Sequence, residues 1–101
     1  MINKPIEVFR ECIPLFNALS DPARQDIILL LAEVESLSVN EISEKSNLSR
    51  PTISHHLKIM KDNNLVTIEK KGKQRLYSLS LDQSIEQLKR LINIVESECI
   101  Y

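Results

Sequence analysis

The basic side chains of this sequence gather in one segment. Residues 45–75 carry eight Lys or Arg against two acidic residues, a net charge of +6, whereas the whole chain sums to −1. Because clustered cations attract a phosphate backbone, this segment predicts binding to nucleic acid. The alternative is a solvated charged face that binds nothing.

Two stretches of this segment offer different contacts to DNA. The first can donate to base edges, and its best candidate for a guanine contact is Arg50, because a guanidinium can bond O6 and N7 together. The second offers cations for phosphates. The candidate contacts are Ser49, Arg50, Thr52, Ser54, His55 and Lys58 in the first stretch, and Lys70, Lys71, Lys73 and Arg75 in the second. Ordinary solvated surface is the alternative for both.

The two histidines are adjacent, which disfavours a metal site. Neighbours on a helix point about 100° apart, so His55 and His56 cannot easily converge on one ion. His56 lies beside an apolar face, so we expect it to be packed or to lie near a phosphate. Arg24 is expected to be structural, because it falls in the first turn of a helix close to Asp21.

The two cysteines leave three interpretations open. Cys12 and Cys99 lie on or beside apolar helical stripes and can be small buried hydrophobes. They can instead form a thiol switch between the first and last helices, or a soft-metal or arsenite site with thiols of a partner subunit.

An enzyme is disfavoured by what the sequence lacks. No Cys-His, Ser-His-Asp or paired-carboxylate grouping has a spacing that would converge. Gly72 is the one glycine, which excludes the glycine-rich loops that bind nucleotide phosphates. We therefore expect no catalytic residues, no cofactor and no metal.

The segment from about 38–62 predicts a helix-turn-helix. Ser38 and Glu41 form a capping box that begins a short helix. Ser49 then caps a second helix that runs to about residue 62, with Pro51 in its first turn. Its expected inner face consists of Ile53, Leu57 and Met60. Two short helices joined in this way, the second with a polar outer face, are typical of DNA recognition.

A β-hairpin is predicted over about 64–80. Apolar and polar residues alternate on both sides of a basic turn that has Gly72 at its tip. Tyr77 is expected to support the strands from the core. A basic hairpin that follows a helix-turn-helix is a wing.

Helices at both ends of the chain carry apolar stripes. The first helix, about 5–20, presents Ile6, Phe9, Ile13 and Phe16 at helical spacing, and Pro14 should kink or restart it near Cys12. A helix over about 22–35 follows, with Ile27, Leu30, Leu31 and Val34 buried.

The last helix, about 83–99, has a narrow seam of coiled-coil type that favours a partner helix. Its residues are Ile85, Leu88, Ile92, Val95 and Cys99. The predicted fold is mainly α with a small β-hairpin: one winged helix-turn-helix domain over residues 1–101. The longest apolar run has six residues, so we expect no membrane span and a cytoplasmic protein.

Three motifs together resemble the ArsR/SmtB family of winged-helix repressors. They are Leu15-Phe16-Asn17-Ala18-Leu19-Ser20-Asp21-Pro22-Ala23-Arg24, Leu48-Ser49-Arg50-Pro51-Thr52-Ile53-Ser54-His55-His56-Leu57, and Gly72 with Tyr77-Ser78-Leu79. The resemblance implies a homodimer that packs through its first and last helices and reads an inverted-repeat operator of double-stranded DNA. The implied dimer interface comprises Phe9, Ile13, Phe16, Ile85, Leu88, Ile92 and Val95. Repression relieved by an inducer, often a metal ion, is also implied.

The sequence departs from the metal sensors of that family. They place two cysteines around a valine in the first helix of the helix-turn-helix, where this chain has Ser38 and Asn40. Their other site uses Asp and His on the last helix, where this chain has Asp82 but no histidine beyond His56. The inducer is therefore left open. The alternative function is a winged-helix module that binds protein instead of DNA.

Overall fold

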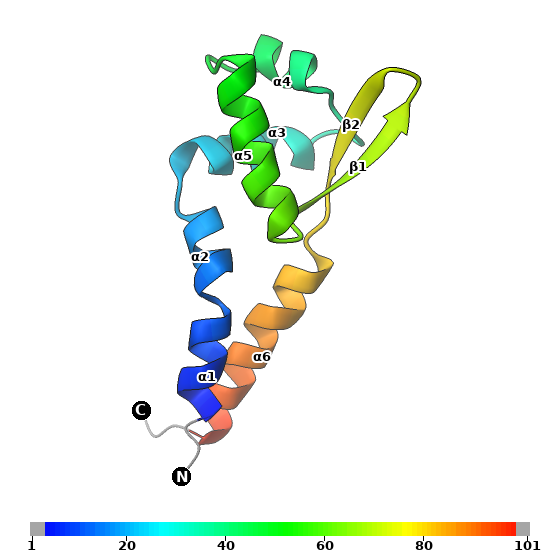
Figure 1. Cartoon of the computed structure of the whole chain (residues 1–101). Coiled ribbons are helices and arrows are strands. Elements are labelled where there is room, and N and C mark those ends of the chain that lie inside the picture. The colour runs from blue at the N-terminus through cyan, green and yellow to red at the C-terminus, as the bar shows by residue number, and fades with distance from the viewer. Residues whose placement is uncertain (1–3, 99–101) are drawn as a thin grey trace.

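Six helices and one β-hairpin form the computed structural model, which describes residues 4–98 (Figure 1). In chain order they are α1 (Lys4–Glu11), α2 (Ile13–Leu19), α3 (Pro22–Ala32), α4 (Val39–Lys45), α5 (Arg50–Asp62), β1 (Val66–Lys71), β2 (Gln74–Leu79) and α6 (Asp82–Glu98). The molecule is elongated, 52 × 24 × 21 Å. Helices α3 to α5 and the hairpin form one end, and α1 packs beside α6 at the other.

The first helix breaks at Cys12, as Pro14 predicts. Pro14 stands in the first turn of α2. A backbone N–H at this position would have no partner within the helix, so its absence in proline removes no hydrogen bond. On the other side of the break, α1 is tied to α6, because Gln87 Nε2 donates to the Glu11 carbonyl at 2.9 Å and Arg90 pairs with the Glu11 carboxylate at 3.1 Å. A small separate apolar cluster of Val8, Cys12 and Leu91 fills this contact.

Helix α3 begins at the predicted cap and ends earlier than predicted. The Asp21 carboxylate accepts the backbone N–H groups of Ala23 and Arg24. The helix stops at Ala32, so Val34 falls in the following turn and is 42% exposed, and the prediction that it is buried was wrong. Leu37 fills the core in its place, held by a backbone bridge to Tyr77.

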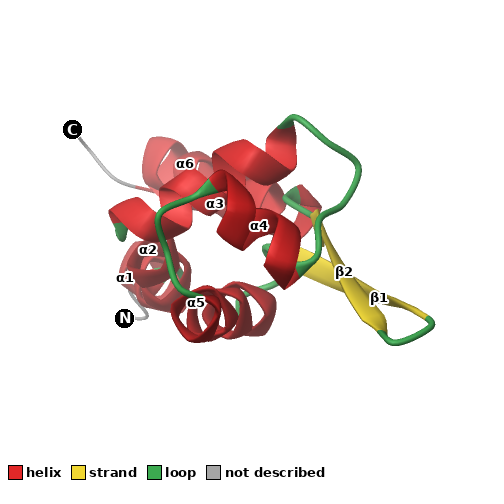
Figure 2. Ribbon diagram, turned by 90° about the horizontal axis from the view of Figure 1, so that it is seen from above, coloured by secondary structure: helices red, strands yellow, loops and turns green. Residues whose placement is uncertain are grey.

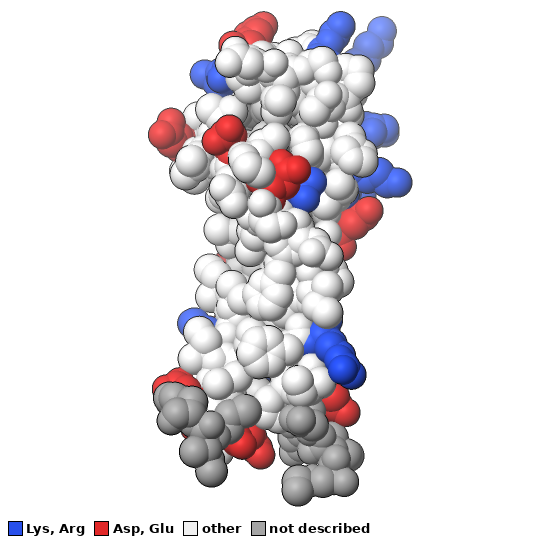
Figure 3. All heavy atoms as spheres, turned by 90° about the vertical axis from the view of Figure 1, so that its left-hand side faces the viewer, with Lys and Arg blue, Asp and Glu red and all other residues white. Residues whose placement is uncertain are grey.

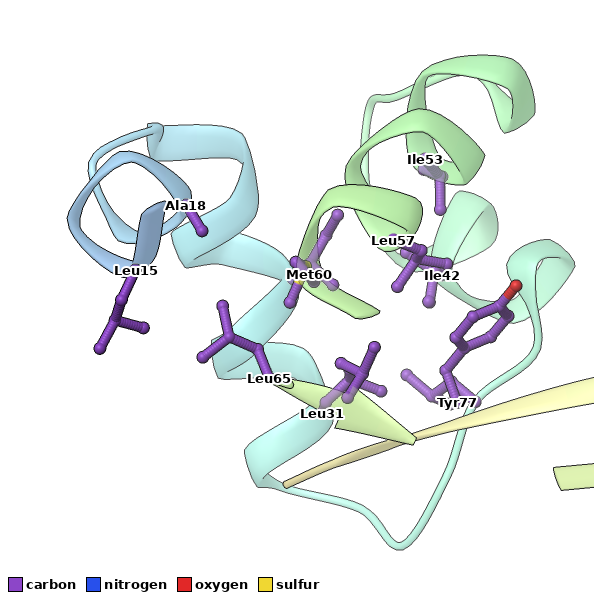
Figure 4. Packing of buried hydrophobic residues seen from close by; sticks show 12 residues of the cluster. Leu15, Ala18, Leu31, Ile42, Ile53, Leu57, Met60, Leu65 and Tyr77 are labelled. Carbon is purple, nitrogen blue, oxygen red and sulfur yellow. The ribbon is translucent and has the colours of Figure 1, made fainter. Parts of the chain in front are cut away.

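The main core lies between α3, α4, α5 and the hairpin. Ile53, Leu57 and Met60 are fully buried, which confirms the predicted inner face of α5. Figure 4 shows Leu57, Ile42 and Tyr77 among the apolar side chains gathered between the helices and the hairpin. Both helix caps of this region are also confirmed: Ser38 and Glu41 form a complete capping box, and the Ser49 hydroxyl accepts the N–H of Thr52. The helix-turn-helix is therefore held from beneath by hydrophobic packing and at its helix starts by polar caps.

The hairpin projects from the helical body (Figure 2). Its antiparallel register pairs Val66 with Leu79 and Lys71 with Gln74. The turn needs a left-handed residue, which Gly72 supplies at φ 62°. Among the described helices, none has both the length and the apolarity needed to cross a membrane.

Candidate nucleic-acid interface

The outer face of α5 presents the predicted base-reading residues to solvent. Ser49, Arg50, Ser54, His55 and Lys58 are exposed and Thr52 is partly exposed. The opposite face of α5 is buried in the hydrophobic core, so packing holds in place the helix that carries these side chains. A helix exposed in this way can enter a major groove, where side chains of its first turns reach base edges.

Arg50 is held by a neighbour that the sequence analysis did not assign to this surface. Its Nη1 donates to the Asn40 Oδ1 of α4 at 3.0 Å, across the turn of the helix-turn-helix. The resemblance to metal sensors identifies Asn40 only as the residue that stands where they have a thiolate. Asn40 and Arg50 are ten residues apart and lie on different helices, so no helical spacing in the sequence predicts their contact.

The strand alternation sorts the basic residues of the wing onto two faces. Lys70 pairs with Arg75, and both share the face that carries Ile68 and Tyr77, because side chains two positions apart lie on one side of a strand. Lys71 pairs with Gln74 on the opposite face. The wing therefore directs Lys70 and Arg75 to one side and Lys71 to the other.

A groove of about 300 Å³ runs between α5 and the face of the hairpin that carries Arg75. Its lining consists of Ser54, Leu57, Lys58, Lys61, Ile68, Arg75 and Tyr77. Lys61 was not among the predicted contacts. Its spacing of seven from Ser54 and three from Lys58 puts it on their helical face and could have revealed it. Three cations at the edge of one groove favour a phosphate backbone passing between helix and wing.

The charge distribution agrees with this placement. In Figure 3, Lys and Arg side chains gather along one edge of the half of the molecule that holds the helix-turn-helix and hairpin. At mid-height the same view shows a stretch of surface with no charged side chain.

His56 faces inward and meets Arg24. The residue is 9% exposed, and its Nδ1 lies 3.2 Å from Nη1 of Arg24. Burial lowers the pKa of His56, with Asp21 opposing the shift and Arg24 and His55 adding to it. The prediction of a packed histidine is confirmed, as is the structural role expected for Arg24.

The predicted dimer residues divide into two groups within the single chain. Phe9, Ile13, Phe16, Ile85 and Ile92 are 38–55% exposed although they are large and apolar. Leu88 and Val95 are partly buried, Leu88 against the main core and Val95 against the small cluster of α1 and α6. The stripes thus leave a substantial apolar surface uncovered on the terminal helices.

Cys12 is a core residue. It has no exposed surface, and burial raises the pKa of its thiol, aided by Glu11 and opposed by Arg90. The lack of solvent access and the raised pKa both disfavour the reactive thiolate. Cys99 lies outside the described residues.

A metal site has no ligand set within residues 4–98, where three or more His, Cys, Asp or Glu side chains nowhere converge. Ser38 and Asn40, the residues compared above with the cysteines of metal sensors, make other contacts in the structure. Ser38 caps α4, and Asn40 accepts the hydrogen bond from Arg50.

A helix-turn-helix with an exposed polar second helix, followed by a basic hairpin, defines a winged helix-turn-helix DNA-binding protein. Comparison with known proteins gives the family. The family model described as "Bacterial regulatory protein, arsR family" matches residues 21–67. The arsenical resistance operon repressor of Staphylococcus xylosus is 36% identical over 93 residues, covering 90% of this chain and 88% of that protein. The chain therefore belongs to the arsR family of bacterial regulatory proteins.

Solved structures confirm the fold. An ArsR-like transcriptional regulator from Rhodococcus sp. RHA1 superposes with a TM-score of 0.80 at 24% identity, covering 90% of this chain and 83% of the other. A homodimeric winged helix-turn-helix DNA-binding domain from Mycobacterium bovis gives 0.71 at 21% identity, covering 97% and 89%. These likenesses concern architecture, and the relatives are named as regulators of transcription.

Proposed function

We propose that this protein is a homodimeric transcriptional repressor that binds an inverted-repeat operator. The observation that carries the proposal is the exposed polar face of α5 beside a groove edged by Lys58, Lys61 and Arg75. Such an arrangement offers base contacts and phosphate contacts at once, as operator binding requires.

The α5 residues divide between bases and backbone in this proposal. Arg50 contacts a guanine, while Ser49, Thr52, Ser54 and His55 contact base edges or phosphates beside it. Lys58 and the wing residues Lys70, Lys71, Lys73 and Arg75 bind phosphates. Phosphate contacts fix the protein on the duplex and carry no sequence information directly.

The apolar surface of the terminal helices supports the proposed dimer. Phe9, Ile13, Phe16 and Ile92 would remain in water in a monomer, and an uncovered apolar patch of this kind marks an interface. The Mycobacterium bovis neighbour is described as homodimeric, and the same assembly suits this chain. A two-fold dimer places two copies of α5 on the DNA, which is why an inverted repeat is the expected target. The repressor would act in the cytoplasm, where bacterial DNA lies.

The signal that relieves repression differs from that of metal sensors in this proposal. The Staphylococcus xylosus relative is named for arsenical resistance, but Ser38 and Asn40 offer no thiolate for a soft ion. We therefore expect zinc, cobalt and nickel to leave operator affinity unchanged. The burial of Cys12 favours its interpretation as a packing residue over a thiol switch with Cys99.

The test is preferential binding. Duplexes selected by the protein from fragments of its source genome should contain an inverted repeat, and affinity should fall steeply with salt as cations release counterions from phosphate. A module that binds only protein would show neither property. Equal affinity for a selected and a scrambled duplex near physiological salt would refute the repressor proposal.

A further inference from the structure

One guanidinium joins the end of α2 to the recognition helix α5. Arg24 Nε donates to the carbonyl of Ala18 at 2.8 Å and Nη2 to that of Asn17 at 2.9 Å. These carbonyls lie in the last turn of α2, where intrahelical partners are lacking. On its other side the same group meets His56 Nδ1 at 3.2 Å.

Asp21, at the start of α3, also holds Arg24; the contacts of Arg24 with Asp21, α2 and His56 are called the Arg24 junction below. The N–H of Arg24 bonds the Asp21 carboxylate, and Nη1 lies 3.8 Å from the second oxygen of that carboxylate. The side chain of Arg24 is only 12% exposed, so it is held by packing as well as by bonds. These contacts hold the Arg24 side chain between the end of α2 and the recognition helix.

The two helices that Arg24 joins carry different parts of the proposed interfaces. Helix α2 exposes Ile13 and Phe16, which belong to the proposed dimer interface, and α5 exposes Arg50 and His55, which belong to the proposed DNA contacts. The angle between these helices determines how the two recognition helices of a dimer are separated and tilted. A repressor must match that separation to the spacing of its half-sites.

We propose that Arg24 is a positioning residue for DNA recognition, which sets the orientation of α5 relative to α2 by hydrogen bonding to both at once. The proposal rests on the proposed function, since it concerns the geometry of operator binding. Arg24 itself need not touch DNA.

This junction requires an unprotonated His56. Arginine has donors only, so Nδ1 must be the acceptor, and a protonated imidazole has no acceptor to offer. The groups that act electrostatically on His56 are Asp21 and Arg24 at the start of α3 and His55 on α5. Within the described residues, α4 and β1 also pack on α5, and neither contributes a charged group to those that shift the pKa of His56.

The direction of the pH effect follows from the same geometry. Burial lowers the pKa of His56 below its ordinary value of 6.5, so the folded chain favours the neutral ring. The contribution of this junction is therefore present above pH 6.5 and is lost as the pH falls through the folded-state pKa of His56.

Two variants test the junction without removing its bulk. Arg24→Lys keeps the charge but loses the planar fork, and His56→Leu removes the acceptor. Each should weaken binding to a duplex selected by the wild-type protein about tenfold, the effect of losing one hydrogen bond to a charged group. Binding to an unrelated duplex of the same length should change less than about threefold, since phosphate attraction does not depend on helix angle. Arg90→Lys, at the exposed ion pair with Glu11, is the matched control and should retain full discrimination.

A pH profile separates this role from a purely structural one. His56→Asn places an amide oxygen near the position of Nδ1 and cannot be protonated, so its discrimination between the two duplexes should stay constant as the pH is lowered from about 7.5 through the folded-state pKa of His56. Discrimination by the wild type should fall over the same range. His55→Asn changes the neighbouring exposed ring and, whatever affinity it costs, should keep the wild-type fall.

The outcomes distinguish the two proposals. A wild-type protein that discriminates, with Arg24→Lys and His56→Leu discriminating equally well, overturns the positioning role alone. A wild-type protein that prefers no duplex overturns the proposed function and this inference with it. If His56→Leu has no cooperative thermal transition, Arg24→Lys and the His56→Asn profile decide the matter, and a profile that falls like that of the wild type overturns the inference.

Discussion

The two faces of the wing should contribute unequally to DNA binding. Lys70 and Arg75 share the face that lines the groove beside α5, whereas Lys71 lies on the other face. Each phosphate contact contributes about 0.9 to the slope of log affinity against log salt. The proposed dimer has two wings, so replacing both Lys70 and Arg75 by Ala should reduce the slope by roughly 3.6.

This change in slope predicts a measurable loss of affinity. Raising the salt from about 0.1 M to about 0.3 M should reduce the ratio of wild-type affinity to double-variant affinity roughly 50-fold. The assay is fluorescence anisotropy on a selected duplex across a salt series. Lys71→Ala is the matched comparison from the other face of the wing. Because the groove lies on the face of Lys70, Lys71 should contact phosphate less closely, and the slope of Lys71→Ala should stay closer to that of the wild type than the slope of Lys70→Ala. Equal effects of Lys70→Ala and Lys71→Ala would refute the assignment of faces.

Three further predictions concern the dimer, base recognition and the thiol. Ile92, 55% exposed on α6, should tolerate replacement by Glu without unfolding, and Ile92→Glu should sediment as a monomer with weak operator binding; a dimer of normal affinity contradicts the interface. Arg50→Ala should weaken binding by roughly 1–3 kcal/mol at a matched site and relax base preference there. Asn40→Ala should have a weaker effect of the same kind, because it frees the Arg50 guanidinium. Unchanged base preference in both variants contradicts the role of Arg50. In a Cys99→Ser variant the buried thiol of Cys12 should react with a maleimide only on unfolding, and rapid labelling of the folded protein would revive the thiol switch.

Local signals in the sequence predicted most of the architecture. The caps at Ser38 and Ser49, the break caused by Pro14 and the glycine turn at residue 72 all act within a few residues, so their effects could be read without tertiary information. The alternation of the strands likewise predicted the hairpin. Apolar periodicity identified the inner face of α5 because that face is buried along its whole length.

What the sequence did not predict depends on contacts between distant residues. Val34 continued the apolar pattern of α3, but the chain turned after Ala32 because Leu37 paired with Tyr77, forty residues away. The bond from Arg50 to Asn40 and the meeting of Arg24 with His56 also cross between elements. Helix packing determines such pairs, and no local spacing encodes them.

The most direct test of the account is selection of DNA fragments by the purified protein, followed by measurement of affinity and stoichiometry on the enriched sequence. We predict an inverted repeat bound by two chains, with affinity that exceeds that for a scrambled duplex at physiological salt and falls steeply as salt rises. Enrichment of no sequence, with equal and weak binding to every duplex, would contradict the central claim.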